Sequence, residues 1–244
     1  MEGTDMSKHT TIITGASTGI GRATAEQLAA AGHLVIGMAR REVEGFPGEY
    51  YRVDLADQQA TEKTLKEIVA KHEVDGLVNN VGIVFPAPLE EIQLDDLRKV
   101  YDVNVRVAVQ CTQAVVPQMK SKKYGRIVNI ASLVTSGVPH RTSYAASKCA
   151  LVSCTSSWAL ELALYGITVN AISPGPTATE MFSKNNPPGS DGYKRYTGMV
   201  PMKRVAPPEE IANVITFFMS EGASYVTGQH VFADGGASVG PAPE

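Results

Sequence analysis

Short apolar runs alternate with helix-length amphipathic segments along almost all of the 244-residue sequence. Several runs are apolar at nearly every position, which is typical of strands that helices cover on both faces. This alternation predicts an α/β fold with a doubly wound parallel sheet and helices on both sides. The expected strands are 10–14, 34–39, 49–52, 76–79, 126–131, 167–172 and 230–233, and the expected helices are 20–31, 59–71, 94–119, 143–165 and 208–219.

The chain contains neither an internal repeat nor an interdomain linker, so we expect a single domain over residues 9–237. Residues 1–8 are expected to form a flexible extension, and residues 238–244 a loose C-terminal tail. The most irregular interior stretch, residues 181–205, is rich in proline and glycine. We expect it to be a substrate loop, because long inserts in compact domains are usually lids or binding loops.

The composition excludes several classes of protein. With 22 basic and 25 acidic residues the net charge is −3, which argues against a nucleic-acid binder. The three cysteines, Cys111, Cys149 and Cys154, lie in no metal-binding pattern, so no metal is expected. The first nine residues lack the apolar core of a signal peptide, and no apolar run is long enough for a membrane span. We therefore expect a cytoplasmic protein without a nucleic-acid or membrane partner.

The first expected strand runs into the glycine-rich segment TGASTGIG at residues 14–21. Gly15 can make the tight turn, Gly19 lets a pyrophosphate approach the backbone, and Gly21 lets the helix pack closely on the sheet. A purely structural turn is the alternative, but a strand before the loop and a helix after it favour a dinucleotide site. The expected contacts of this loop are Gly15, Ser17, Thr18, Gly19, Ile20 and Gly21.

The end of the second strand indicates which cofactor is bound. In dinucleotide folds an acidic residue there binds the 2′-hydroxyl of NAD, whereas arginine accommodates the 2′-phosphate of NADP. Here the acidic position falls on Ala39, and Arg40 and Arg41 follow at once. Guanidinium groups match phosphate well, so we expect NADP(H). NAD(H) remains the alternative if the two arginines only begin a solvated loop.

Three further signals lie downstream. The segment NNVG at 79–82 ends one expected strand, and Ser132 ends another. Tyr144 and Lys148 are four residues apart in an expected helix, so the ammonium can stand beside the phenol. A tyrosine and a lysine at this spacing are usually an ordinary helix surface. Together with the glycine loop and the serine, they favour a catalytic group.

With these motifs the sequence resembles the classical short-chain dehydrogenase/reductase family over about residues 10–237. The resemblance includes the segments 14–21 and 79–82, Asn104, Ser132, Tyr144, Lys148, VNA at 169–171, PG at 174–175, YVTGQ at 225–229 and DGG at 234–236. It implies a single-domain Rossmann-like fold. It also implies reversible hydride transfer between NADP(H) and a ketone or secondary alcohol.

The resemblance implies a role for each catalytic residue. Tyr144 is expected to be the general acid in ketone reduction and the base in the reverse direction. Lys148 is expected to lower the pKa of the phenol from its ordinary value of about 10 and to bind the nicotinamide ribose. Ser132 is expected to hold the substrate oxygen. Asn104 is expected to bind a water that relays protons through Lys148, and it can also tie a helix kink to backbone.

Further cofactor contacts follow from the same resemblance. Asp54 and Leu55 are expected near the adenine, Asn80 and Gly82 near the adenosine ribose, and Thr179 near the carboxamide. The remaining expected contacts are Pro174, Gly175 and Thr177. The sequence also departs from the family pattern at two places. Ser132 and Tyr144 are twelve residues apart, one fewer than the commonest spacing, and Val81 replaces the usual alanine.

The substrate is indicated only by class. The expected pocket residues are Val84, Val134, Val138, His140 and Met181, where His140 is either a substrate ligand or an ordinary loop residue. This mostly apolar set favours a neutral ketone or secondary alcohol. The 3-oxoacyl-carrier-protein reductases resemble this chain in length and ending, and they remain the alternative. They often carry an arginine where this chain has Tyr165.

The expected helices 94–119 and 143–165 are longer and more apolar than one sheet face requires, which implies a second buried face. In the family these helices form a four-helix bundle about a two-fold axis, so we expect a homotetramer. A non-catalytic dinucleotide sensor is the rival from another class, and Ser132, Tyr144 and Lys148 together argue against it. An epimerase or dehydratase usually has a larger substrate domain.

Overall fold

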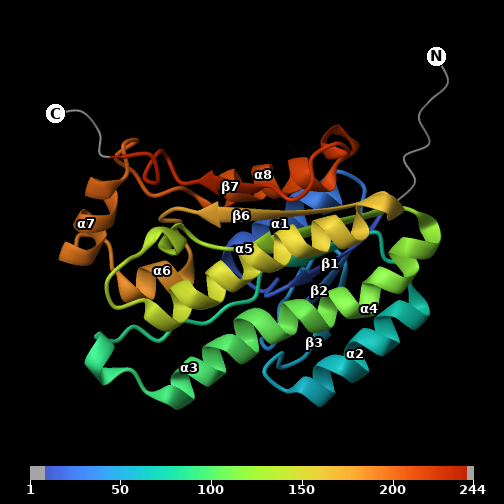
Figure 1. Ribbon diagram of the computed structural model, residues 1–244, viewed down its shortest axis with the longest axis horizontal. Helices are drawn as coiled ribbons and strands as arrows, with labels where there is room; N and C mark the ends of the chain where they lie inside the picture. Colours follow the sequence, from blue (N-terminus) through green and yellow to red (C-terminus); the bar gives the residue numbers. More distant parts are fainter. Residues whose placement is uncertain (1–8, 241–244) are drawn as a thin grey trace.

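The structure is a computed structural model that describes residues 9–240. Its seven strands form one parallel sheet in the order β3-β2-β1-β4-β5-β6-β7 (Figure 1). The strands are β1 (Thr10–Thr14), β2 (Leu34–Ala39), β3 (Glu49–Arg52), β4 (Gly76–Asn79), β5 (Gly125–Ile130), β6 (Ile167–Pro174) and β7 (His230–Ala233). The predicted Rossmann-like fold is confirmed. Five strand ranges agree with the prediction, while β5 begins and ends one residue earlier and β6 extends two residues further.

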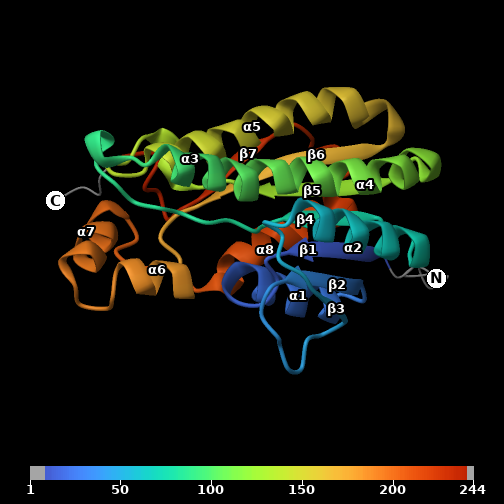
Figure 2. The same cartoon turned by 90° about the horizontal axis from the view of Figure 1, so that it is seen from below.

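Helices cover both faces of the sheet, as Figure 2 shows. On one face α1 (Gly19–Ala30) and α8 (Pro208–Met219) bury Leu28 and Ile215 against strand residues such as Ile13. On the other face lie α2 (Gln58–Lys71), α4 (Val107–Lys122) and α5 (Thr142–Leu162), which pack on strand residues such as Ile12. Successive residues of one strand therefore pack into the cores on the two faces of the sheet, which explains why several strands are apolar at nearly every position.

The prediction of one continuous helix over 94–119 is wrong in one respect. The segment consists of α3 (Leu94–Tyr101), a π-helical turn (Asp102–Arg106) and α4. In the π turn the amide of Val107 donates to the carbonyl of Asp102, five residues earlier. The apolar pattern continues through this turn, so the sequence does not reveal it. The predicted helix 143–165 is α5 followed by a 3₁₀ turn at Ala163–Tyr165.

The stretch 181–205, predicted to be an irregular loop, contains two short helices. These are α6 (Glu180–Asn185) and α7 (Asp191–Met199), called the lid helices below. Thr179 and Ser190 are their N-caps, accepting hydrogen bonds from the amides of Phe182 and Tyr193. Capping side chains and aromatic contacts of Phe182 thus order a segment whose prolines and glycines indicated a loop. The remaining 3₁₀ turns are Leu89–Glu91, Leu133–Ser136 and Glu221–Ala223.

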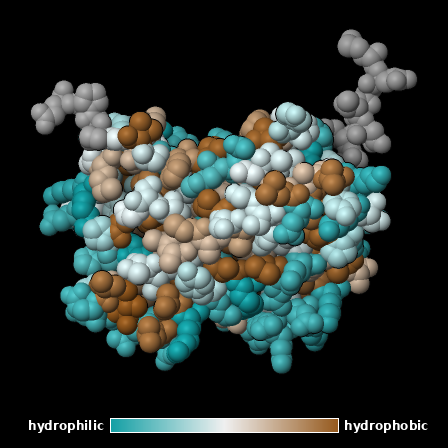
Figure 3. Space-filling model, in the orientation of Figure 1, coloured by the Kyte–Doolittle hydropathy of each residue, from teal (hydrophilic) through white to brown (hydrophobic). Residues whose placement is uncertain are grey.

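The predicted flexible extension 1–8 and residues 241–244 of the predicted tail lie outside the described residues. The start of that tail is tied to the end of β7, because the amide of Ser238 donates to Asp234 Oδ2 at 2.7 Å. No helix in the range 9–240 is long and apolar enough to span a bilayer. On the face over α4 and α5, apolar side chains are spread between polar ones (Figure 3).

Candidate active site

Lys148 lies at the centre of the site, where α5 crosses the carboxyl end of β5. Its side chain is 2% exposed, and Nζ donates a hydrogen bond to the carbonyl of Ile130 at 2.6 Å. Burial lowers the pKa of Lys148 to about 8. Tyr144 precedes it by one helical turn, and Lys148 Nζ is 5.7 Å from the centre of the tyrosine ring. The predicted pairing of these two side chains on one helix face is therefore found.

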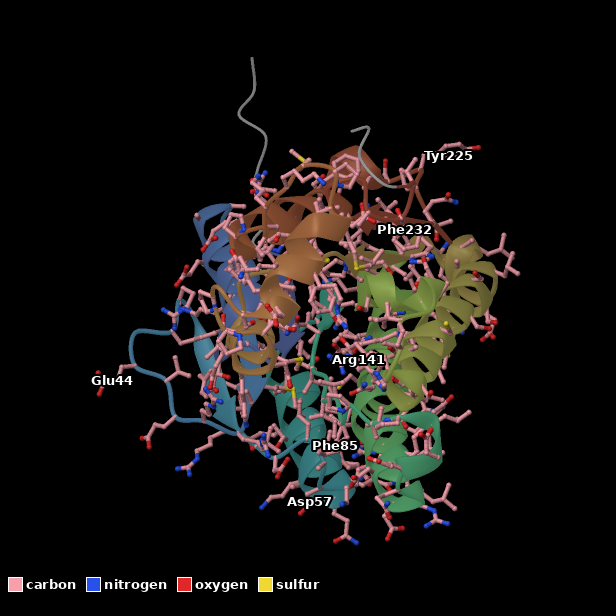
Figure 4. All side chains as sticks on the ribbon, turned by 90° about the vertical axis from the view of Figure 1, so that its left-hand side faces the viewer. Glu44, Asp57, Phe85, Arg141, Tyr225 and Phe232 are labelled. Atoms are coloured by element: carbon pink, nitrogen blue, oxygen red, sulfur yellow. The ribbon has the colours of Figure 1, made fainter. Side chains whose placement is uncertain are left out.

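Ser132 lies two residues beyond the end of β5 and close enough to Tyr144 to act on the pKa of its phenol. Burial raises the pKa of Tyr144 above its ordinary value, while Ser132 and the charge of Arg141 act in the opposite direction. The ammonium of Lys148 donates to Ile130, and its predicted lowering of the phenol pKa stays a prediction. Figure 4 looks onto this edge, where Arg141 lies between the lid helices and α5.

Asn104 lies in the π turn and is 1% exposed. Its Oδ1 accepts from the amide of Ile83 at 2.8 Å, and its Nδ2 donates to the Ile83 carbonyl at 3.1 Å and to Ser147 Oγ at 2.9 Å. The side chain thus ties the bent helix to the segment after β4. A Cβ atom on Gly82 would come within 3.4 Å of Lys148 Nζ and 3.5 Å of Asn104 Oδ1. These contacts bring Asn104, Gly82 and Lys148 together, while the water-binding role of Asn104 stays a prediction.

The glycine loop has the shape that a pyrophosphate requires. Gly15 has φ +67°, and a Cβ on Gly21 would lie 2.4 Å from the Gly15 carbonyl oxygen. A Cβ on Gly19 would lie 3.0 Å from a methyl group of Thr179. The N-cap Thr18 makes no side-chain capping bond, so the first amides of α1 remain available to an anion. The residues present therefore fit a bound dinucleotide.

Asn80 supports this loop from the neighbouring strand. Its Nδ2 donates to the carbonyls of Thr14 at 3.0 Å and Gly15 at 3.1 Å. The hydroxyl of Thr14 in turn accepts from the amides of Asn80 and Val81. The side chain of Asn80 holds the turn, and its predicted contact with ribose stays a prediction.

The two arginines after β2 have different surroundings. Arg40 is exposed, and in residues 9–240 its side chain has neither a hydrogen bond nor an ion pair. Arg41 forms a bidentate ion pair with Glu180 of α6, with Nη2 2.9 Å from Oε1. This pair joins the segment after β2 to the first lid helix. The sequence prediction missed Glu180, because the two partners are 139 positions apart.

The other predicted cofactor residues line the same edge. Asp54 accepts from the amide of Ala56, and the carbonyl of Leu55 accepts from Arg106 Nη2. A Cβ on Gly175 would lie 2.7 Å from the Cα of Asp234. Thr177, after Pro174 and Gly175, donates to the Gly175 carbonyl, and Thr179 caps α6. Ser17, Thr18 and Ile20 lie within the glycine loop and the start of α1.

The predicted pocket residues lie on three segments. Val134 is buried in the 3₁₀ turn after Ser132, and Val84 and Val138 are half-buried. Met181 is 41% exposed on α6. His140 is exposed with φ +62°, and its carbonyl accepts from the amide of Ala87. Its geometry is that of a loop residue that joins two segments. No cluster of metal-ligating side chains occurs in the described part of the chain.

Comparison with known proteins agrees with this geometry. The family model described as enoyl-(acyl carrier protein) reductase matches residues 15–238. The chain is 37% identical over 238 residues to the 3-oxoacyl-[acyl-carrier-protein] reductase FabG of Thermotoga maritima, covering 92% of this chain and 96% of the relative. The chain belongs to the short-chain dehydrogenase/reductase family. It is therefore an oxidoreductase of that family.

Two solved structures resemble it over nearly the whole chain. One, from Beutenbergia cavernae, is described as an NAD(P)-dependent gluconate 5-dehydrogenase with bound NADP. It is 35% identical, with a TM-score of 0.90, covering 95% of this chain and 97% of the other. The second is a 3-oxoacyl (acyl-carrier-protein) reductase from Agrobacterium tumefaciens with bound NADP, 29% identical, with a TM-score of 0.88 and 93% of each chain covered.

Proposed function

We propose that this oxidoreductase interconverts a ketone and a secondary alcohol by hydride transfer with NADP(H). The observation that carries the proposal is the buried Lys148 beside Tyr144, with Ser132 close enough to lower the pKa of that tyrosine. This group lies at the carboxyl edge of the sheet, where the glycine loop also ends. Ligands of such folds bind at that edge.

Bound NADPH would supply the hydride, held by the glycine loop, Arg40 and Lys148. Ser132 donates a hydrogen bond to the substrate oxygen and orients the carbonyl. Tyr144 then donates its phenolic proton to that oxygen as the alcohol forms. The charge of Lys148 stabilises the resulting phenolate, and a water at Asn104 returns the proton through Lys148. In alcohol oxidation the same groups act in reverse.

Arg40 supports NADP(H) over NAD(H) as the preferred cofactor. Its guanidinium is exposed after β2 and is not engaged by another described side chain, whereas no carboxylate stands at the end of that strand. Two similar structures were solved with NADP. NAD(H) remains the alternative cofactor.

A second candidate function is 3-oxoacyl-carrier-protein reduction, favoured by the relatives that carry this name. The chemistry would be the same, with the ketone on a thioester-linked acyl chain. Tyr165 argues for a free ketone, because it replaces the arginine that often serves such carriers. Its ring instead lies 4.6 Å from the Nζ of Lys120.

The decisive experiment follows NADPH and NADH oxidation with free ketones, a 3-oxoacyl thioester of coenzyme A and the same acyl group on carrier protein. Turnover of free ketones at rates equal to the carrier-bound substrate supports the first proposal. Strong preference for the carrier-bound substrate favours the second. Cofactor binding without turnover of any substrate would support the non-catalytic sensor.

We also propose a homotetramer assembled through α4 and α5. Leu160, near the end of α5, and Leu164, in the 3₁₀ turn that follows it, are 84% and 95% exposed, which is unusual for leucine beside a core. Light scattering after size exclusion tests this proposal. A monomer would contradict it.

A further inference from the structure

Ser173 lies on β6, directly beside the catalytic Ser132. It is fully buried, and its hydroxyl accepts from the Ser132 amide at 3.1 Å and donates to the Ser132 carbonyl at 3.0 Å. The last backbone bond between the two segments joins the Ala131 amide to the Ile172 carbonyl at 2.7 Å. The Ser173 side chain thus continues the β5–β6 ladder by one step, at the point where Ser132 leaves the sheet.

The two backbone groups of Ser132 depend on Ser173 unequally. The Ser132 carbonyl also accepts from the amide of Thr135 at 3.1 Å and from its hydroxyl at 2.9 Å. Among the described residues, the Ser132 amide has Ser173 as its acceptor. Loss of the Ser173 hydroxyl would therefore leave that amide unpaired, and an unpaired buried donor is costly. Ser132 would be free to move, together with the hydroxyl that lowers the pKa of Tyr144.

His230 on β7 determines which way the Ser173 hydroxyl points. Its Nε2 is 2.7 Å from Ser173 Oγ, and the two residues are diagonal neighbours, because Ala171 pairs with His230 and Ser173 with Phe232. A serine hydroxyl carries one proton. When that proton is donated to the Ser132 carbonyl, His230 Nε2 must itself carry a hydrogen and donate. The Phe232 ring, 4.6 Å from the imidazole, packs against it.

We propose that Ser173 is a positioning residue that fixes Ser132 against Tyr144, and that His230 orients the Ser173 hydroxyl for this task. The proposal rests on the proposed reaction at Ser132 and Tyr144, and it extends the site to a third strand. Sequence analysis missed both residues. The only signal was that Ser173 directly follows the expected strand 167–172, as Ser132 directly follows the expected strand 126–131.

Thr168 offers a matched control on the same strand. It is a buried hydroxyl residue of β6 at the opposite edge of the sheet, and its Oγ1 has no hydrogen-bond partner among the described residues. Thr168→Val and Ser173→Ala both remove one buried hydroxyl from β6. They differ in whether that hydroxyl contacts Ser132.

The first readout is steady-state kinetics with NADPH and a ketone that the wild type reduces. Ser173→Ala is expected to lower kcat about tenfold, the value of one hydrogen bond near the reacting atoms, with the KM for NADPH within about twofold. Thr168→Val is expected to keep the wild-type kcat. His230→Leu should lower kcat by about threefold, whereas His230→Gln, which retains a donor, should keep most of it. If Ser173→Ala does not fold, the two His230 variants decide.

The second readout is independent of turnover. The Tyr144 phenol is titrated by ultraviolet difference spectra against Tyr144→Phe. The groups that face it are Ser132 after β5, Arg141 and Lys148 around the start of α5, and Tyr196 on α7. Because Ser132 lowers the pKa of Tyr144, Ser173→Ala should raise it, and Thr168→Val should not. Equal titrations in the two variants would overturn the positioning role. A wild type without turnover would refute only the proposed function, since the titration still decides the role of Ser173.

Discussion

The catalytic group and the two arginines after β2 lie on the same edge of the sheet but are built differently. Lys148 and Asn104 are 2% and 1% exposed and are hydrogen-bonded to backbone groups of Ile130 and Ile83. The Arg41 side chain is 58% exposed, and it is paired with one carboxylate. In the proposed function, folding thus fixes the geometry of proton transfer in advance, while selection between cofactors depends on surface charges, which salt screens.

The largest expected effect is that of Tyr144→Phe in the buried group, which should change kcat far more than NADPH affinity. Loss of the phenolic proton is expected to lower kcat by roughly 10²–10⁴-fold, the usual value of a general acid. NADPH affinity should stay within about twofold, because the phosphate-binding groups are untouched. Fluorescence titration and NADPH oxidation measure the two quantities. Tyr193→Phe on α7 is the control, and a fully active Tyr144→Phe would remove this residue from the acid role.

The burial of Lys148 should be visible in the pH dependence of stability. Its folded pKa of about 8 lies below the ordinary value of 10.5, so between these pH values the unfolded chain retains a proton that the folded protein has released. The free energy of unfolding should therefore gain up to about 1.4 kcal/mol per pH unit across this window. Below about pH 8 the slope disappears, because Lys148 is protonated in both the folded and the unfolded state.

Urea unfolding of the cofactor-free protein between pH 7 and 10 measures this slope. Lys148→Met should lack the part of the slope that this lysine contributes, while Lys66→Met, at an exposed position of α2, should keep it. Identical slopes in wild type and Lys148→Met would show that the buried amine keeps its ordinary pKa.

Arg40→Ala tests the exposed region. A hydrogen bond to a charged group contributes about 1.5–3 kcal/mol, so NADPH should bind about 10- to 100-fold more weakly, with NADH changed less than about twofold. Added salt should reduce the difference between the two cofactors. Arg98→Ala on α3 controls for general loss of charge. Equal weakening of both cofactors would contradict a 2′-phosphate contact.

The smallest effect is expected for Glu180→Gln, which releases Arg41 from its ion pair. Exposed pairs are weak, so NADPH should bind only about two- to fivefold more tightly, with NADH unaffected. Glu210→Gln, which breaks the comparable pair with Arg204, is the matched control. Weaker NADPH binding in Glu180→Gln would show instead that the ion pair keeps Arg41 in place for the phosphate.

Local patterns explain which features could be predicted. Continuous apolar runs mark strands such as β2 because helices cover both faces, and the glycine spacing and the Tyr144–Lys148 interval are short-range signals. The structure differs from the sequence prediction where residues that are far apart in the chain come into contact. The ion pair of Arg41 with Glu180 and the contact of Ser173 with Ser132 depend on how strands and loops come together. The pKa of Lys148 depends on burial, which no local spacing encodes.

The π-helical turn at Asp102–Arg106 limits which insertions and deletions the chain can accept. Deleting one residue there would leave a regular α-helix and rotate α4 by about 100° relative to α3. Val107, Cys111 and Val115 would then turn away from the sheet, and Asn104 from Ile83. Between Ser132 and Tyr144, by contrast, residues 135–142 are all partly or fully exposed. Length changes between related enzymes should therefore occur in that segment and avoid the π turn.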